Sequence, residues 1–326
     1  MHPFQYVRVR ESRGAVDAGR AAETSYLAGG TSILDLMKLG VERPNRIVDI
    51  NALPYQKVEE SAGGVAIGAL ARNSDVADHP LIKTRYPAIS QALLSGASPQ
   101  LRNMASMSGN LLQRTRCPYF REVASACNKR RPGSGCAAMD GYNRMHAILG
   151  TSASCIAVHP SDLCVALMAL EASVHTERPA GARAIPIADF HRLPEDHPEL
   201  ETVLEPGEVI THITLPATPF FSRSRYVKVR DRASFAFALA SAAVALDVAQ
   251  GRVHAARVAL GGVATKPWRS VETEQALVGE PATLATFERA AALSVAAAQT
   301  RKHNVFKVAL LKSTLVRALS SVAEVT

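Results

Sequence analysis

Four of the five cysteines in this chain lie in one segment, at Cys117, Cys127, Cys136 and Cys155. The residues between them are rich in proline, glycine, serine and arginine, a composition that argues against a regular strand or a long helix. Cysteine thiolates hold iron–sulfur clusters and are frequent ligands of zinc. Four thiols gathered on irregular backbone therefore indicate a metal or iron–sulfur site.

The charge and spacing of this segment favour an iron–sulfur cluster. A cluster with four thiolates is a net anion that needs N–H donors and cations nearby, and the segment offers the run K-R-R and the glycines of P-G-S-G-C. Structural zinc sites usually use short C-x-x-C knuckles, whereas nine, eight and eighteen residues separate these cysteines. Zinc remains an alternative, as do two disulfides in an exported chain and a merely solvated basic loop.

The fifth cysteine, Cys164, is predicted to lie outside the cluster. It falls on an apolar-periodic helix, where a cysteine is more often a small buried residue than a ligand. The sequence also contains no G-x-S-x-G nucleophile motif and no E-x-x-H or H-x-x-x-H spacing. The lack of an obvious hydrolytic centre favours a role in which cofactors do the chemistry.

A glycine-containing turn near the N-terminus has the features of a phosphate cradle. An apolar strand end meets Gly29 and Gly30, and Ser32 is placed to cap a helix with Asp35 as its capping-box partner. Such a turn aims backbone N–H groups and the positive end of a helix dipole at one point. Taken alone, a turn of this kind more often joins a strand to a helix without any ligand.

A second turn strengthens this interpretation. Ser106, Ser108, Gly109 and Asn110 supply compact hydrogen-bonding groups and close access to the backbone. The pyrophosphate of a dinucleotide is usually held by more than one backbone segment. Two such turns in one domain therefore favour a dinucleotide cofactor.

The composition is that of a two-domain globular protein with an acidic partner or anionic cofactors. The chain has 326 residues, 47% hydrophobic and 20% charged, with a formal net charge of +8. Aromatic residues make up only 5%, and no basic helix is visible, so nucleic acid is not expected as a partner. The longest apolar stretch, residues 235–249, is too short to span a membrane. No export signal is expected at the N-terminus.

A change in composition, to a segment rich in prolines and charged residues, predicts a domain boundary shortly after Pro216. Before it, strands are expected at residues 4–10, 46–51 and 64–69, and a helix at 87–97. After it, three strands within residues 225–263 indicate an antiparallel meander. Two alanine-rich helices, at 283–300 and 305–322, complete a small α+β module.

The motifs together resemble a known family, the FAD-binding subunits of the molybdenum hydroxylases, which include xanthine and carbon monoxide dehydrogenases. The likeness covers essentially the whole chain and rests on A-G-G-T-S-I-L-D-L-M-K, S-M-S-G-N-L, H-P-S-D-L-C-V-A-L-M-A-L and Y-V-K-V-R-D-R-A-S-F-A-F-A-L. The runs Q-R-T-R-C-P-Y-F and C-N-K-R-R-P-G-S-G-C-A-A-M-D-G resemble the cluster-bearing branch of periplasmic aldehyde oxidoreductases.

The resemblance implies an α+β fold of two domains. Residues 1–217 would form an FAD-binding domain of the vanillyl-alcohol-oxidase (PCMH) type, with a 4Fe-4S insertion at about 113–157. Residues 222–326 would form a small domain like the C-terminal domain of CO dehydrogenase flavoproteins, with a three-stranded antiparallel sheet and helices.

The resemblance also implies which residues hold the cofactors. The 4Fe-4S ligands would be Cys117, Cys127, Cys136 and Cys155. Ser108 departs from the family, which often has a second glycine there. The FAD contacts would be Ala28, Gly29, Gly30, Thr31, Ser32, Leu34, Ser106, Gly109, Asn110, Asp162, Leu215 and Lys228.

The function implied is electron transfer, with no catalytic residue on this chain. A molybdenum-cofactor large subunit would oxidise aldehydes to carboxylic acids, and a small subunit with 2Fe-2S clusters would relay electrons to this chain and on to an external acceptor. The three would form a heterotrimer, exported to the periplasm by a signal-bearing partner, with a cytoplasmic complex as the alternative. The rival functions are a zinc-stapled binding protein and a self-contained flavin oxidase.

Overall fold

The computed structural model describes residues 1–323, and the chain begins with a small parallel sheet. Its strands lie in the order β1-β3-β2, and both pairings are parallel. Parallel neighbours need crossover connections, which two short helices provide. The elements are β1 (Gln5–Arg8), α1 (Ser12–Gly19), β2 (Thr24–Leu27), α2 (Ile33–Lys38) and β3 (Arg46–Asp49).

An antiparallel five-stranded sheet forms the centre of the first domain, in the order β4-β5-β8-β6-β7. Buried and partly exposed residues alternate along β6 and β8, as expected of strands that face a core on one side. The strands are β4 (Val58–Ser61), β5 (Gly64–Gly68), β6 (Ser173–Glu177), β7 (Arg183–Pro186) and β8 (Val209–Pro216).

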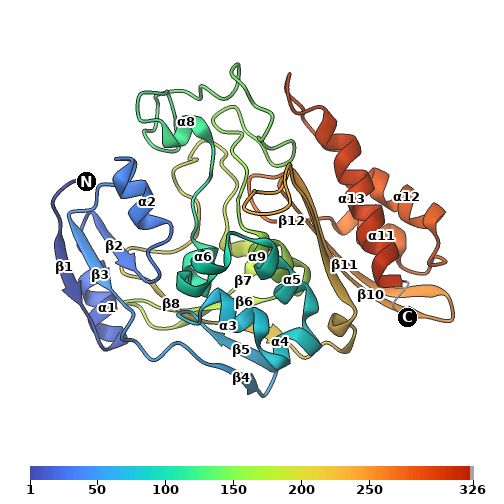
Figure 1. The fold of residues 1–326 in the computed structure, drawn as a ribbon, viewed down its shortest axis with the longest axis horizontal. Coiled ribbons are helices and arrows are strands. Elements are labelled where there is room, and N and C mark those ends of the chain that lie inside the picture. The colour runs from blue at the N-terminus through green and yellow to red at the C-terminus, as the bar shows by residue number, and fades with distance from the viewer. Residues whose placement is uncertain (324–326) are drawn as a thin grey trace.

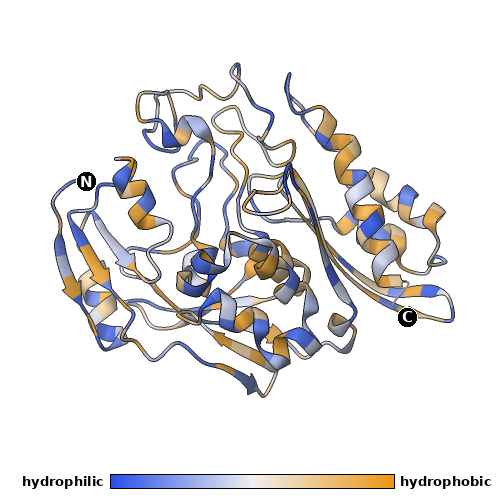
Figure 2. Ribbon diagram, viewed as in Figure 1, coloured by the Kyte–Doolittle hydropathy of each residue, from blue (hydrophilic) through white to orange (hydrophobic). Residues whose placement is uncertain are grey.

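Helices pack against this sheet, and the second sequence turn leads into one of them, α7 (Figure 1). The most apolar of them, α9, is buried at the centre of the molecule (Figure 2). The helices are α3 (Asn73–Asp78), α4 (Pro80–Arg85), α5 (Pro87–Ser95), α6 (Pro99–Met104), α7 (Met107–Leu111), α9 (Asp162–Ala169) and α10 (Ile187–Phe190).

The cysteine segment runs between α7 and α9 and stands out from the helices as a set of loops (Figure 1). Its one described helix is α8 (Pro118–Arg121), and an isolated bridge joins Cys127 to Cys136. The irregular backbone predicted from its composition is therefore confirmed. We call residues 113–157 the insertion.

The second domain is a four-stranded antiparallel sheet, in the order β12-β11-β10-β9, covered on one face by three helices (Figure 1). The α+β class is confirmed, but the predicted count of three strands is wrong. The fourth strand has two residues, too few for an alternating pattern to appear in the sequence. The elements are η1 (Pro219–Ser222), β9 (Ser224–Val229), β10 (Ala240–Ala249), β11 (Arg252–Gly261), β12 (Trp268–Arg269), α11 (Val271–Leu277), α12 (Leu284–Leu293) and α13 (Phe306–Ala323).

The long strand β10 joins the two domains because both of its faces are buried. Ala242 and Val244 pack with the C-terminal helices, whereas Ala243 and Ala245 belong to the same core as α9. A strand that is buried on both faces has apolar residues at successive positions instead of an alternating pattern. This burial explains the longest apolar stretch of the sequence. The strand begins later than predicted, at Ala240. Among the described residues, no helix is both long and apolar enough to cross a membrane.

Candidate cofactor sites

The first glycine turn connects β2 to α2 through a tight backbone. Gly30 has a φ of +74°, in the left-handed region that favours glycine. A Cβ on Gly29 would lie 2.0 Å from the carbonyl oxygen of Met104, at the end of α6. Only glycine fits at this contact, so the first turn is held directly against the segment that leads into the second.

The capping box predicted for this turn does not form. Ser32 has helical backbone angles, and its side chain makes no capping hydrogen bond. Asp35 instead accepts hydrogen bonds from Arg116 and Arg121 of the insertion. The carboxylate is attracted to two guanidinium groups that are distant in sequence, and a local capping pattern cannot anticipate that contact.

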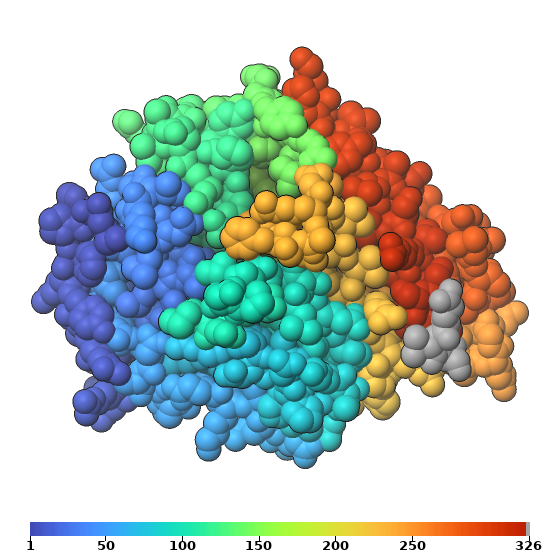
Figure 3. Space-filling model, viewed as in Figure 1, coloured from blue at the N-terminus to red at the C-terminus, as the bar shows by residue number. Residues whose placement is uncertain are grey.

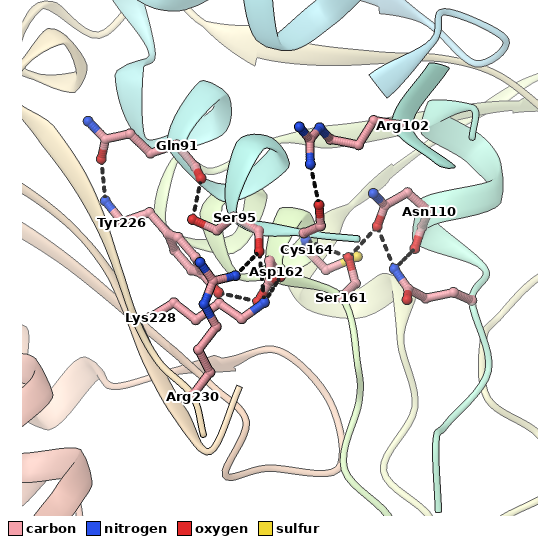
Figure 4. Close-up of polar contacts among 12 residues, drawn as sticks. Gln91, Ser95, Arg102, Asn110, Ser161, Asp162, Cys164, Tyr226, Lys228 and Arg230 are labelled. Carbon is pink, nitrogen blue, oxygen red and sulfur yellow. Dashed lines mark hydrogen bonds and ion pairs between the residues drawn. The ribbon is translucent and has the colours of Figure 1, made fainter. Parts of the chain in front are cut away.

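The second turn and the start of α9 are built in the same way and linked to each other (Figure 4). The Gly109 N–H donates to Ser106 Oγ at 3.1 Å, and the Cys164 N–H donates to Ser161 Oγ at 3.1 Å. The Ser161 hydroxyl then donates to Asn110 Oδ1 at 2.7 Å. Two serine-capped helix starts are thereby fixed side by side.

A cavity of about 650 Å³, which we call the large cavity, lies where these turns meet the insertion and the C-terminal domain. Figure 3 shows the surface hollowed between the insertion, in green, and an orange segment of the C-terminal domain. Ligand cavities commonly measure about 300–1,000 Å³, so a dinucleotide fits in size. Six of the predicted FAD contacts line it: Thr31, Ser32, Gly109, Asn110, Asp162 and Lys228.

The other six predicted contacts lie outside this lining: Ala28, Gly29, Gly30, Leu34, Ser106 and Leu215. Ser106 is 1% exposed and caps α7, so its buried side chain supports the turn without lining the cavity. Leu215 was expected to approach from the second domain. It instead pairs with Val65 in the first-domain sheet and is 1% exposed.

A buried ion pair joins the two domains at this cavity (Figure 4). Lys228 Nζ lies 2.7 Å from Asp162 Oδ2, and the two side chains are 3% and 10% exposed. The Tyr226 hydroxyl donates to the other oxygen of Asp162. Burial, and then the charge of Asp162, raises the pKa of Tyr226 well above its ordinary value. Asp162 and Lys228, which were predicted as separate FAD contacts, thus form one ion pair.

Sequence reasoning missed several residues of the large cavity. Arg102, Arg116, Phe235 and Phe237 all line it. The Arg116 guanidinium lies 5.2 Å from the centre of the Phe237 ring. The sequence F-A-F at residues 235–237 is typical of a strand, but in the structure these residues form a loop beside the cavity. Their strand-like pattern is the reason that they were not predicted to line it.

The four predicted ligands converge on a second, smaller cavity, which we call the cysteine cavity. Cys117, Cys127, Cys136 and Cys155 all line it. All five cysteines of the described chain are free thiols, which does not favour the disulfide alternative. Burial raises the pKa of Cys117 to about 12 and that of Cys155 to about 11, so a bound metal would have to displace the thiol protons.

The four sulfurs are not gathered as closely as the ligands of one zinc ion. A tetrahedral zinc with bonds of about 2.3 Å holds its sulfurs about 3.8 Å apart. Among the described residues, no three of these four sulfurs lie all within 4.8 Å of one another.

Backbone and side-chain hydrogen bonds hold the cysteine loops in place. The Cys127 N–H donates to Ser134 Oγ at 3.1 Å, and the Cys155 N–H donates to Ser152 Oγ at 3.2 Å. Arg130 donates to the carbonyl oxygens of Tyr119 and Phe120, at 2.9 and 2.6 Å. At least one of the basic residues near the cysteines is therefore a structural clamp.

The set whose ligand atoms lie within 4.8 Å of one another is His159, Cys164 and His191, and none of the three lines the cysteine cavity. Cys164 is 0% exposed, and burial raises its pKa to about 12. Burial lowers the pKa of His191 to about 4 and that of His159 well below its ordinary value. The Ser161 N–H donates to His159 Nδ1 at 3.4 Å. These groups pack as a neutral core, and Cys164 lies outside the cysteine cavity.

The two cavities meet at Cys117, which lines both. The Nε2 atom of His146 lies 3.1 Å from its sulfur. Burial, and then the nearby charge of Lys307, lowers the pKa of His146 to about 4.

Family models match nearly the whole chain. Residues 2–218 match the FAD binding domain in molybdopterin dehydrogenase, and residues 225–322 match the CO dehydrogenase flavoprotein C-terminal domain.

Individual proteins agree with these matches. The chain is 47% identical over 323 residues to the aldehyde oxidoreductase FAD-binding subunit PaoB of Escherichia coli, covering 98% of each. It is 28% identical to the glyceraldehyde dehydrogenase medium chain of Sulfolobus acidocaldarius, covering 86% of this chain and 83% of that one. Among solved structures, a chain of carbon monoxide dehydrogenase from Hydrogenophaga pseudoflava superposes with a TM-score of 0.77 at 25% identity, covering 99% of this chain and 98% of that one.

Proposed function

This chain belongs to the FAD-binding medium subunits of the molybdenum hydroxylases, and we propose that it carries FAD and a 4Fe-4S cluster in an aldehyde oxidoreductase. The complex would oxidise aldehydes to carboxylic acids on a partner subunit. The observation that carries the proposal is the identity of 47% to an aldehyde oxidoreductase subunit across 98% of the chain.

The large cavity supports the FAD part of the proposal. Two turns with accessible backbone, at Thr31–Ser32 and Gly109–Asn110, face the cavity together with Asp162 and Lys228. Backbone N–H groups at such turns bind the pyrophosphate of dinucleotides. FAD bound there would supply electron exchange with a partner, while the protein fixes its position and excludes water.

The cysteine cavity supports the 4Fe-4S part. Four cysteines surround one small space, and no three of their sulfurs lie all within 4.8 Å of one another, as the ligands of a tetrahedral zinc would. We propose Cys117, Cys127, Cys136 and Cys155 as the four ligands. The zinc-stapled alternative predicts stoichiometric zinc without iron, which metal analysis distinguishes.

The complex would contain a molybdenum-cofactor large subunit and a small subunit with 2Fe-2S clusters, as a heterotrimer. Electrons from the small subunit would pass through this chain to an external acceptor. We place the complex in the periplasm, exported with a signal-bearing partner, and keep the cytoplasm as the alternative. Fractionation with a tagged chain distinguishes the two compartments.

The direct test is quantification of flavin, iron, labile sulfide and zinc in the anaerobically purified complex. We expect one FAD and four iron atoms bound to this chain. A complex without flavin or without iron and sulfide contradicts the proposal. Aldehyde turnover by this chain alone, free of molybdenum, would instead support a self-contained flavin oxidase.

A further inference from the structure

His146 lines the large cavity next to Cys117, the cysteine that also lines the cysteine cavity. Its Nε2 atom is 3.1 Å from Cys117 Sγ, and both residues line the large cavity. Among the cysteines of the described chain, only Cys117 lines both cavities. The imidazole of His146 therefore contacts Cys117, the proposed cluster ligand that lies between the two proposed cofactor sites.

The surroundings of the ring determine which nitrogen carries the proton. Nδ1 is buried and has no hydrogen-bond partner among the described residues. A proton on Nδ1 would leave a buried N–H without an acceptor, which is unfavourable. The proton therefore belongs on Nε2, where it points to the sulfur of Cys117.

Buried polar groups from the C-terminal domain hold the loop that carries His146. The side-chain amide of Asn304 donates to the His146 carbonyl oxygen at 3.4 Å, and Lys307 Nζ donates to the Met145 carbonyl oxygen at 3.2 Å. The Asn143 side chain accepts from the His303 N–H at 3.1 Å. Asn143, Asn304 and Lys307 are at most 1% exposed. The C-terminal domain thus holds the backbone of the loop that carries the ring.

We propose that His146 is a positioning residue that donates a hydrogen bond from Nε2 to the Cys117 ligand and raises the reduction potential of the cluster. This inference rests on the proposed cluster. Reduction adds negative charge to the cluster and its thiolates, so an N–H donor at sulfur stabilises the reduced state more than the oxidised state. The same bond orients Cys117 at the boundary with the large cavity.

The test is a redox titration of the purified complex, followed by electron paramagnetic resonance of the reduced cluster. His146→Phe keeps an aromatic ring but removes the N–H donor, so the midpoint potential should shift to a lower value. His146→Gln keeps an N–H donor and should shift it less. His303→Phe is the matched control, because the His303 ring packs at a tilt against Tyr142 with ring centres 5.1 Å apart, and the substitution keeps the backbone N–H that Asn143 accepts. Its potential should equal that of the wild type.

The outcomes separate this inference from the proposed function. Iron and sulfide in the wild type with an unchanged potential in His146→Phe overturn the role of His146 and leave the cluster intact. A wild-type complex without iron and sulfide overturns both. If His146→Phe fails to bind iron, ¹⁵N-histidine labelling decides. A ¹⁵N coupling to the reduced cluster that is present in the wild type and lost in His146→Gln supports the bond, and its absence from the wild type refutes it.

Discussion

The large cavity and the cysteine cavity lie next to each other but are built by different means. Helix starts and the buried Asp162–Lys228 pair form one part of the wall of the large cavity, and loops of the insertion and of the C-terminal domain form the rest. Loops form the walls of the cysteine cavity, and the one described helix of the insertion has four residues. Side chains such as Arg130 hold these loops by binding backbone carbonyl oxygens.

This difference predicts how each cavity depends on its ligand. Helices and strands satisfy their own backbone hydrogen bonds, so the helical part of the wall of the large cavity keeps its shape without a cofactor. The insertion is held by separate turn and side-chain hydrogen bonds, and a metal group bound by four thiols would contribute folding free energy directly. Perturbing the cysteines should therefore affect the insertion most, whereas perturbing the Asp162–Lys228 pair should affect the joined domains.

The largest expected effect comes from Cys127→Ser. Because four thiolates hold the proposed cluster, iron and labile sulfide should fall to near zero while flavin stays bound. Amides of the insertion should exchange hydrogen faster, measured by mass spectrometry. Cys164→Ser is the matched control and should retain full iron. Full iron in Cys127→Ser, or its loss in Cys164→Ser, would reverse the ligand assignment.

Next in size is the loss of the buried ion pair. Asp162→Ala leaves the ammonium of Lys228 buried and unpaired, which should cost about 3–5 kcal/mol of unfolding free energy. Chemical denaturation measures the change. Glu280→Ala breaks an exposed pair with Arg289 and should cost less than about 1 kcal/mol. Equal losses in the two variants would mean that the pair does not join the domains.

A smaller effect is expected from Gly29→Ala, because the new methyl group would collide with the Met104 carbonyl oxygen. We expect a loss of about 1–3 kcal/mol of stability, with lower flavin occupancy and unchanged iron. Gly63→Ala is the control, since a Cβ there meets no atom within 4 Å. Normal flavin binding by Gly29→Ala would show that the turn does not need its tight contact.

The smallest effect concerns acid stability of the insertion. Burial opposes ionisation of Glu201, but Lys129 and Arg114 outweigh it and lower its pKa. A lowered folded pKa stabilises the protein above the unfolded glutamate value of about 4.3 and ceases to do so as pH falls through the folded value. Hydrogen exchange near Lys129 should therefore rise below about pH 4, before exchange in α9. Glu201→Gln should remove this step.

Local features were predictable from the sequence. The glycine turn after the first apolar strand and the apolar-periodic helix that carries Cys164 were visible, because each signal depends on residues a few positions apart. The irregular insertion followed from its composition. The apolar run of β10 was visible, although its two-sided burial was not.

Contacts between distant residues were not predictable. Asp35 lies 81 positions from Arg116, and Asp162 lies 66 positions from Lys228, so only the folded topology brings these charges together. The Ser32 capping box failed because Asp35 pairs with arginines of the insertion instead. Leu215 was assigned to the cofactor by resemblance; the pairing of β8 with β5 places its side chain in the core, and a contact through its backbone stays a prediction.

The contact of Asn304 with the His146 carbonyl oxygen, 158 positions earlier in the chain, has a consequence for biogenesis. A ribosome makes the cysteine loops long before it makes the residues that support them. The loop at His146 cannot reach its final shape until synthesis is nearly complete. Cluster delivery to a nascent chain would therefore meet an unfinished site, and maturation after release fits this order of events.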